Sequence, residues 1–406
     1  MKIAIIGAGA AGCFAAANIA RRSGVEVALF EKTGKVMQKV KVSGGGRCNV
    51  THECFDIPTL VDRYPRGRQL LRKSLYRFGP QQTIDWFAAR GVRLKTEDDG
   101  RMFPTTNDSQ TIIDAIWQEM QQQQVLVYYH KSVKRITIRP GEAQRFLIEF
   151  ADTSVYAADK VLIAAGGFPK AEQYEWLTAT GHHIESPVPS LFTFNIPKHP
   201  ITELMGVSVP DAAVKVAGAK TTQQGPLLIT HWGMSGPAVL RTSAIAAREL
   251  ATCSYEFRAV VNWLGATTDD ELREQLQQLR MEHGKQFVAQ KNPFGLPRRL
   301  WEYMMPRCGI TDQTRWGDIP AAARNKLTEH LLRDVYNVSG KTTFKEEFVT
   351  CGGIKLTEVD AQTMESRVHK DLYFAGEIMD VDGITGGYNF QHAWSSGYTA
   401  AMAMQQ

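Results

Sequence analysis

The chain has 406 residues, of which 43% are hydrophobic and 22% are charged, and this composition excludes a disordered or fibrous protein. Its formal net charge is +5. No apolar run approaches the ~20 residues that span a bilayer, so we expect a cytoplasmic protein without membrane contact. Six scattered cysteines without a C-x-x-C pair argue against a disulfide framework and against a metal site. The length of the chain favours two domains, or one domain with a large insertion.

The N-terminal residues predict a strand, a helix and a second strand around a glycine-rich turn. A β-branched run at 2–6 leads into G-x-G-x-x-G as an alanine-rich helix opens, and Glu31 ends the second strand. Such glycines let backbone N–H groups approach a pyrophosphate, and a carboxylate at that strand end accepts hydrogen bonds from ribose hydroxyls. A glycine-rich helix start without a ligand is the alternative. The predicted dinucleotide contacts here are Gly7, Gly9, Ala10, Ala11, Gly12, Glu31 and Lys32.

A second glycine run, KVSGGGRCNVT, occupies residues 41–51. Consecutive glycines let a backbone lie close to a flat ring, and their N–H groups can polarise that ring. We interpret Arg47 as a charge partner for a phosphate or a substrate. Cys48 is either a thiol whose pKa is lowered beside Arg47 or, as the favoured alternative, a small residue packed under a cofactor.

Basic residues are concentrated between residues 32 and 77, a window with eleven Lys and Arg against three Asp and Glu. Residues 62–79 within it predict a helix with basic i, i+4 pairs and with aromatic residues between them. This pattern could hold the phosphates of RNA and stack one of its bases, whereas a solvated helix face, which is commoner in general, is the alternative. The basic pairs are Arg68 with Arg72 and Lys73 with Arg77, and the aromatic residues are Tyr64, Tyr76 and Phe78.

The middle of the chain changes its pattern twice. Strands are predicted at 125–130, 132–138, 145–150 and 160–167, and the glutamines at 121–124 end a helix. After residue 190, short β-like pieces are broken by Gly and Pro, and three helical segments follow, the last at 321–337. We therefore predict an α/β nucleotide-binding domain, at 1–190 and 341–406, interrupted by an insert. The insert at 191–340 would consist of a small β-barrel at 191–265 and a helical part at 266–340.

A third glycine-rich turn lies at residues 371–397. A strand ends at Gly376 and Glu377, a loop with three more glycines follows, and a helix begins near Asn389. An acidic residue after glycine at such a strand end is typical of contact with the ribityl or pyrophosphate region of a flavin. The helix N-terminus can stabilise negative charge at the N1/O2 edge of the flavin ring.

Together, the three glycine-rich segments and the strand predicted at 160–167, which ends in small residues, favour FAD over NAD. They predict a Rossmann-type, glutathione reductase-like FAD-binding domain, with residues 43–49 along the ribityl chain and ring. The predicted FAD contacts beyond the first motif are Ser43, Gly44, Gly45, Gly46, Arg47, Cys48, Asn49, Val133, Ala164, Ala165, Gly166, Gly376, Glu377, Gly387, Tyr388, Asn389 and Phe390.

Five separated motifs carry a family resemblance. They are GAGAAG, SGGGRCNVT, THWGMSGPAVL at 230–240, CGGIKLTEVDAQTMESR at 351–367 and GEIMDVDGITGGYNFQHAWSSG at 376–397. This set resembles the BaiN/RdsA family of NAD(P)/FAD-dependent oxidoreductases. The resemblance implies an FAD domain interrupted by a β-barrel plus helical insert. It also implies reduction of a bile-acid enone, oxidation of aminoacetone, or reduction of a ribosomal RNA uridine to dihydrouridine. One departure is Ala164-Ala165-Gly166, which lacks the hydroxyl of the usual Ala-Thr-Gly.

We therefore expect an FAD-dependent reductase that uses NAD(P)H to saturate a conjugated double bond, with uridine in 23S ribosomal RNA as the leading substrate. NAD(P)H would visit transiently, because no second G-x-G-x-x-G occurs. RNA would contact the stretch from Arg63 to Arg77. A small-molecule oxidoreductase acting on a steroid-like enone or an amine, or a flavin-bearing binding protein without turnover, are the alternatives. The catalytic candidates, each with a packing role as its alternative, are Cys48, His231, Tyr388 and His392.

Overall fold

The computed structural model describes residues 1–342 and 349–406. The chain divides into two compact units, Met1–Ser190 with Phe344–Gln406, and Leu191–Thr343. Residues 343–348, which fall in the second segment of the predicted FAD-binding domain, lie outside the described residues. Each unit is described by itself below.

The first unit is built on a five-stranded parallel sheet with the order β20-β10-β1-β2-β6. Strand β1 is almost completely buried, as expected for a parallel strand covered on both faces, and its run KIAII is continuously apolar after Lys2. The predicted α/β class and Rossmann-type sheet are confirmed. The strands are β1 at Lys2–Ile6, β2 at Glu26–Phe30, β6 at Leu126–Tyr128, β10 at Lys160–Ile163 and β20 at Leu372–Phe374.

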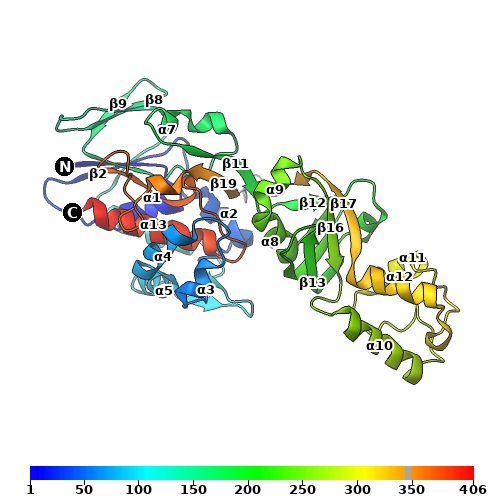
Figure 1. Cartoon of the computed structure of the whole chain (residues 1–406). Coiled ribbons are helices and arrows are strands. Elements are labelled where there is room, and N and C mark those ends of the chain that lie inside the picture. The colour runs from blue at the N-terminus through cyan, green and yellow to red at the C-terminus, as the bar shows by residue number, and fades with distance from the viewer. Residues whose placement is uncertain (343–348) are drawn as a thin grey trace. The chain divides into compact units, whose positions relative to one another are not determined.

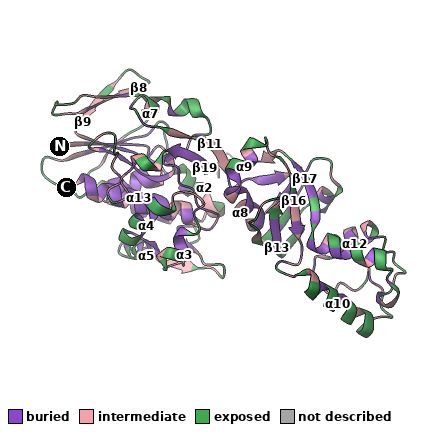
Figure 2. Ribbon diagram, in the orientation of Figure 1, coloured by how far each residue is buried: buried purple, intermediate pink, exposed green. Residues whose placement is uncertain are grey.

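Two helices from opposite ends of the chain pack side by side against this sheet: α1 at Ala10–Ala17 and α13 at Tyr388–Met404 (Figure 1). Both are buried along most of their length (Figure 2). A glycine makes the close approach possible, because a Cβ at Gly397 would lie 2.6 Å from the carbonyl oxygen of Ala11. The C-terminal helix therefore completes the domain that the N-terminal motif begins.

The rest of the first unit surrounds this core with short elements. Three small antiparallel sheets have the orders β3-β5-β4, β7-β8-β9 and β11-β19. Their strands are β3 at Thr51–His52, β4 at Leu94–Thr96, β5 at Arg101–Pro104, β7 at Val133–Ile138, β8 at Phe146–Phe150, β9 at Val155–Ala158, β11 at Ile184–Ser190 and β19 at Val349–Ile354. The α-helices are α2 at Gln38–Gly46, α3 at Ile57–Val61, α4 at Arg68–Arg77, α5 at Pro80–Ala88, α6 at Ser109–Gln122 and α7 at Glu175–Thr178. The 3₁₀ turns are η1 at Ala171–Tyr174, η4 at Leu356–Glu358 and η5 at Gly376–Ile378.

The second unit contains a seven-stranded antiparallel sheet with the order β17-β16-β13-β14-β15-β12-β18. Its strands are β12 at Thr193–Asn195, β13 at Ser208–Val216, β14 at Gln223–Thr230, β15 at Gly233–Ser235, β16 at Glu256–Asn262, β17 at Asp334–Ser339 and β18 at Lys341–Thr342. The helices are η2 at Pro200–Leu204, α8 at Pro237–Ile245, α9 at Ala247–Thr252, α10 at Asp269–Glu282, α11 at Arg298–Arg307, η3 at Trp316–Asp318 and α12 at Ala321–Leu332.

One boundary prediction in this unit was wrong. The helical segment predicted at 321–337 ends at Leu332, and the residues from Asp334 form β17, which pairs with β16. The reason is a change of period, because burial alternates along DVYNVS as it does in a half-buried strand. The chain thus returns to the sheet after the helices.

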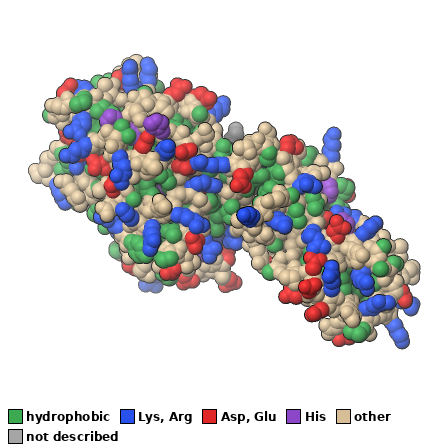
Figure 3. All heavy atoms as spheres, in the orientation of Figure 1, with side chains coloured by type: hydrophobic (Ala, Val, Ile, Leu, Met, Phe, Trp, Pro, Cys, Tyr) green, Lys and Arg blue, Asp and Glu red, His purple; other side chains and the backbone are tan. Residues whose placement is uncertain are grey.

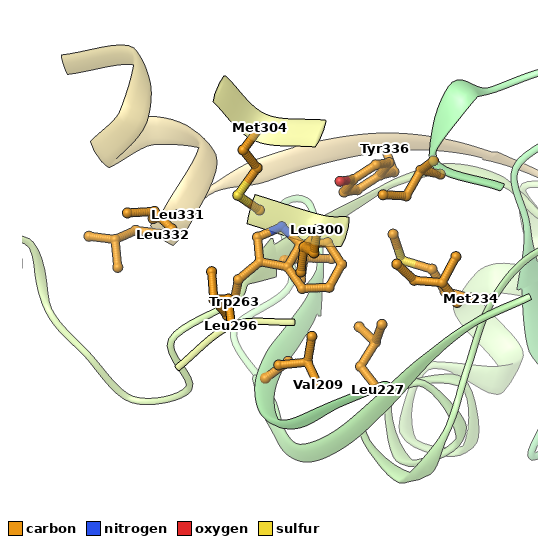
Figure 4. Close-up of a cluster of buried hydrophobic side chains, with 14 of the residues drawn as sticks. Val209, Leu227, Met234, Trp263, Leu296, Leu300, Met304, Leu331, Leu332 and Tyr336 are labelled. Atoms are coloured by element: carbon orange, nitrogen blue, oxygen red, sulfur yellow. The ribbon is translucent and has the colours of Figure 1, made fainter. Parts of the chain in front are cut away.

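Trp263, which follows β16, lies in the apolar core shared by this sheet and the helices (Figure 4). Its indole N–H donates to the buried carboxylate of Asp334 at 3.2 Å, and Arg307 binds both oxygens of that carboxylate at 2.8 and 3.0 Å. Although burial acts to raise it, hydrogen bonds from His330 and Arg307 lower the pKa of Asp334 to about 2. An ionised carboxylate therefore joins the sheet to α11 and α12.

Candidate functional site

The first glycine turn joins β1 to α1, and its three glycines serve different purposes. A Cβ at Gly7 would lie 2.4 Å from the carbonyl oxygen of Ala164, and a Cβ at Gly12 would lie 2.0 Å from the carbonyl oxygen of Gly7. These two glycines therefore allow β1, α1 and β10 to pack closely. A Cβ at Gly9 would meet nothing within 4 Å, so this glycine faces open space at the N-terminus of α1.

Glu31 follows β2 and has a fixed, buried carboxylate beside this turn. Its oxygens accept hydrogen bonds from the backbone N–H of Ala8 at 3.0 Å and from the N–H and hydroxyl of Thr33 at 2.8 and 2.9 Å. Lys32 next to it is exposed. Val133 starts β7, two residues after Lys131, whose N–H donates to the carbonyl of Glu31. Glu31 and Lys32 thus lie at the end of β2, and Val133 follows a segment that is hydrogen-bonded to this strand end.

The second glycine run lies at the C-terminal end of α2, where the backbone departs from helical geometry. Ser43 is extended, and its hydroxyl donates to the carbonyl of Val40 at 2.9 Å. Gly45 and Gly46 have φ of 69° and 85°, a left-handed conformation that favours glycine. A Cβ at either position would meet nothing within 4 Å. A ligand can therefore approach this backbone closely.

Arg47 and Cys48, which follow the run, interact with the protein itself. The Arg47 guanidinium forms an ion pair with Glu97 at 2.6 Å and lies 4.1 Å from the centre of the Phe103 ring. The Cys48 thiol is fully buried, and burial raises its pKa to about 12. The predicted lowering of the thiol pKa is therefore wrong, because loss of solvation outweighs the hydrogen bond with Ser43, which acts to lower the pKa. Contact of Cys48 with the cofactor or the substrate stays a prediction.

The burial of Cys48 predicts its behaviour towards an alkylating reagent. In native protein at pH 8, iodoacetamide should label the exposed Cys253 and leave Cys48 unmodified, because only the thiolate of an accessible cysteine reacts. Peptide mass spectrometry after timed quenching measures both sites, and labelling in denaturant is the control in which both should react. Labelling of Cys48 at the rate of Cys253 in native protein would contradict the buried assignment.

The third glycine-rich segment begins where β20 ends beside β10. The N–H of Gly376 donates to the hydroxyl of Ser396 on α13 at 2.9 Å. The Glu377 carboxylate accepts from the N–H of Thr350 at 2.8 Å and from Lys39 at 2.7 Å. Sequence reasoning missed Thr350 and Lys39. The only signals were the basic window that includes Lys39 and the position of Thr350 just before the CGGIK motif.

Two amides hold the loop that leads into α13. Asn389 binds Gly383 through both of its amide atoms, accepting from its N–H at 2.8 Å and donating to its carbonyl at 3.0 Å. With its amide oxygen and nitrogen exchanged so that both find partners, Asn49 donates to the carbonyl of Thr51 at 3.0 Å and accepts from the N–H of Gly387 at 2.9 Å. In this orientation Asn49 connects the second glycine run to the residue that precedes α13.

Two of the catalytic candidates, Tyr388 and His392, have buried side chains. The Tyr388 side chain is buried, and its ring lies 4.8 Å from that of His52, centre to centre. His392 is buried one turn further along α13, and burial lowers its pKa to about 4. Both of its ring nitrogens are inaccessible and have no hydrogen-bond partner among the residues that the structure describes. A ring that is neutral at neutral pH is a poor proton donor, and contact of His392 with the substrate stays a prediction.

His231 lies in the second unit, in the turn between β14 and β15. Its imidazole is exposed and packs edge-on against Trp232, with 4.4 Å between ring centres. Its role as an acid stays a prediction. Of the remaining predicted contacts, Ala165 and Gly166 are partly accessible at the end of β10, and the Phe390 ring stacks on Trp394.

The basic stretch at 62–79 forms α4 and the turn that precedes it, and only part of the predicted pattern faces solvent. Tyr64 and Phe78 are buried, so the hypothesis that they stack a base is wrong, whereas Tyr76 is 59% exposed. Arg72 and Lys73 are exposed on α4. Figure 3 shows Lys and Arg side chains spread over the visible face of the first unit, with acidic side chains among them. Within the basic stretch, Arg72 and Lys73 on α4 are therefore available to a polyanion.

The site fits an FAD molecule on its own geometry. Gly9, Gly45 and Gly46 leave open the space next to their backbones. A helix N-terminus lies at the first of these positions, and Glu31 provides a fixed carboxylate at the neighbouring strand end. Assignment of single contacts remains a prediction.

The fold and the site define the class, which is a Rossmann-type FAD-dependent oxidoreductase. The chain belongs to the HI0933-like protein Rossmann-domain family, whose sequence model matches residues 1–403. This match confirms the family resemblance seen in the five motifs.

Two curated relatives align over the whole chain. The 3-dehydro-bile acid delta(4,6)-reductase of Clostridium scindens is 28% identical over 414 residues, covering 99% of this chain and 98% of the relative. The ribosomal RNA dihydrouridine synthase of Escherichia coli is 29% identical over 412 residues, covering 98% and 96%. A crystal structure of 3-ketosteroid-delta4-(5alpha)-dehydrogenase from Rhodococcus jostii RHA1 matches with a TM-score of 0.50 and 12% identity, covering 98% and 96%. The structural likeness supports the fold.

Among residues 1–342 and 349–406, no helix has the length and apolar character needed to cross a bilayer. In the same described part of the chain, no group of three or more His, Cys, Asp or Glu side chains is arranged to bind a metal ion.

Proposed function

We propose that the protein is a cytoplasmic reductase that uses NAD(P)H and FAD to saturate a carbon–carbon double bond conjugated to a carbonyl. The leading substrate is uridine in 23S ribosomal RNA, and the product is dihydrouridine. One observation carries the proposal: the chain aligns from end to end with a bile-acid delta(4,6)-reductase and with a ribosomal RNA dihydrouridine synthase. Both names describe saturation of such a bond.

FAD, held at Gly9, Glu31, Gly45 and Gly46, would supply hydride chemistry for the acceptor bond. Backbone N–H groups at Gly45, Gly46 and the first turn of α13 would then stabilise the negative charge that develops on the flavin or on the substrate carbonyl. NAD(P)H would bind transiently, since the chain has a single G-x-G-x-x-G.

As the proton donor we favour Tyr388 or the exposed His231 over Cys48 and His392. Burial raises the pKa of the Cys48 thiol and lowers the pKa of His392, which makes both groups poorer donors at neutral pH. A donor needs to reach the α carbon of the substrate, so its position relative to bound substrate decides between them.

RNA binding would use the outer face of α4. Lys and Arg side chains there neutralise phosphates, and the exposed ring of Tyr76 can stack on an unpaired base. A uridine inside folded RNA must be swung out to reach the flavin, which costs a few kcal/mol that phosphate contacts can offset.

Deleting the gene and mapping dihydrouridine in 23S ribosomal RNA tests the proposed substrate. We expect one dihydrouridine to disappear from the map and to return when the gene is restored. An unchanged map would exclude the RNA substrate. Anaerobic mixing of the purified flavoprotein with NADH or NADPH tests the reaction class separately, because the flavin should bleach whichever acceptor is physiological. A flavin that stays oxidised with both would favour a binding protein without turnover.

A further inference from the structure

Buried contacts join the basic stretch at 62–79 to the loop that leads into α13. The Tyr64 hydroxyl donates to the carbonyl of Tyr388 at 2.7 Å, and the N–H of Ile384 donates to the carbonyl of Arg63 at 3.0 Å. Figure 1 shows α4 beside α13. The segment that offers charge to a polyanion therefore lies directly against the flavin end of the C-terminal helix.

The strongest of these contacts is an ion pair between Arg66 and Asp382. Arg66 Nε donates to Asp382 Oδ1 at 2.5 Å, and Arg66 Nη2 donates to Asp382 Oδ2. The Asp382 side chain is completely buried, and that of Arg66 is only 14% exposed. A bidentate, buried pair fixes the orientation of both groups, and removal of one partner leaves the other charge unbalanced.

Asp382 also binds a third part of the first unit. The Ser190 hydroxyl donates to its Oδ2 at 2.7 Å. Ser190 is the last residue of β11 and of the first unit, so the chain passes to the second unit at the next residue. One carboxylate thus contacts the segment before α4, the loop before α13 and the point where the chain leaves the domain.

The loop transmits the position of Asp382 to α13. Gly383 follows Asp382 directly and is bound at both its N–H and its carbonyl by Asn389, in the first turn of the helix. A shift of the carboxylate therefore shifts the helix N-terminus that the proposed function places at the flavin. The residue before α4 and the residue before Asp382 are closely packed, because a Cβ at Gly67 would lie 2.6 Å from a methyl group of Val381.

We propose that Asp382 is a positioning residue that couples the polyanion-binding face of α4 to the flavin end of α13. Through Arg66 and Gly383, RNA bound on α4 changes the environment of the flavin. The inference rests on the proposed function for its RNA partner. It differs from a purely structural role, in which the ion pair stabilises the fold but RNA leaves the flavin unchanged.

The experiment compares three flavin-loaded proteins: the parent, Asp382→Asn and Asp62→Asn. Asp62→Asn is the matched control, because Asp62 forms an exposed ion pair with Arg68 at 3.1 Å on the same segment. Each protein is titrated with an unmodified 23S ribosomal RNA transcript while binding and the visible flavin spectrum are recorded, without NAD(P)H. We expect RNA to perturb the spectrum of the parent and of Asp62→Asn. Asp382→Asn should bind RNA with a dissociation constant within about twofold of the parent, yet lose the perturbation.

If Asp382→Asn does not fold, Arg66→Lys takes its place, because it keeps the positive charge but cannot form the bidentate contact with Asp382. A parent spectrum that RNA does not perturb, or a variant that responds like the parent, would overturn the proposal, as would a parent that binds no RNA. The readout needs no turnover. An unchanged dihydrouridine map would therefore refute the proposed substrate while leaving a positive spectral result in place.

Discussion

Replacement of Gly9 by valine should leave the protein folded and abolish its flavin. The backbone of Gly9 is extended, with φ of −82° and ψ of −168°, so valine can adopt it without strain. No protein atom lies within 4 Å of the position that its Cβ would take. If the cofactor pyrophosphate lies there, the side chain excludes it, and we expect affinity to fall at least ~100-fold, or about 2.7 kcal/mol. Flavin absorbance after purification and titration of the apoprotein with FAD measure the loss.

Gly7→Val and Gly12→Val are the controls, since the same side chain should act through the fold at these positions. Their Cβ atoms would lie 2.4 and 2.0 Å from backbone oxygens, so strand and helix must move apart. We expect a lower thermal unfolding midpoint in both, and an unchanged midpoint for the Gly9→Val apoprotein relative to the parent apoprotein. A Gly9→Val protein that is isolated with a full complement of flavin would disprove the location of the cofactor.

The cofactor half of the site was predictable because its signals are local. A strand, a glycine turn, a helix start and an acidic strand end follow each other within residues 2–31, and each has its own physical reason. The structure reproduces this order, with Glu31 accepting a hydrogen bond from Ala8 in the turn itself. Spacing alone is sufficient where neighbours in space are also neighbours in sequence.

The catalytic half was not predictable, because its geometry depends on contacts between distant segments. Asn49 binds Gly387, and Arg66 binds Asp382, and no local pattern identifies either pair. Burial is likewise a tertiary property. It makes Cys48 a poor acid, although its neighbours in sequence suggested a reactive thiol. A sequence shows which groups are present, whereas packing decides which of them reach solvent.

The side chains that packing leaves exposed lead to the second large effect that we expect, which is on RNA binding. Arg72 and Lys73 are exposed on α4 and are adjacent in sequence. Changing both to Glu should reduce affinity for 23S ribosomal RNA by at least about tenfold at moderate salt. The slope of log K against log salt should become shallower by roughly 1.4 to 1.8 if both residues contact phosphates. Filter binding at several salt concentrations measures both quantities.

The matched control is the pair Lys134→Glu and Arg135→Glu, which makes the same change of net charge at exposed positions of β7. Flavin content and anaerobic reduction by NAD(P)H should be unchanged in both double variants, because neither pair lies among the predicted FAD contacts. An equal loss of affinity in the two would indicate a long-range effect of net charge rather than contact at α4. No loss in the α4 variant would make that face a solvated helix surface, and a small-molecule acceptor would then become the better reading of the same flavin chemistry.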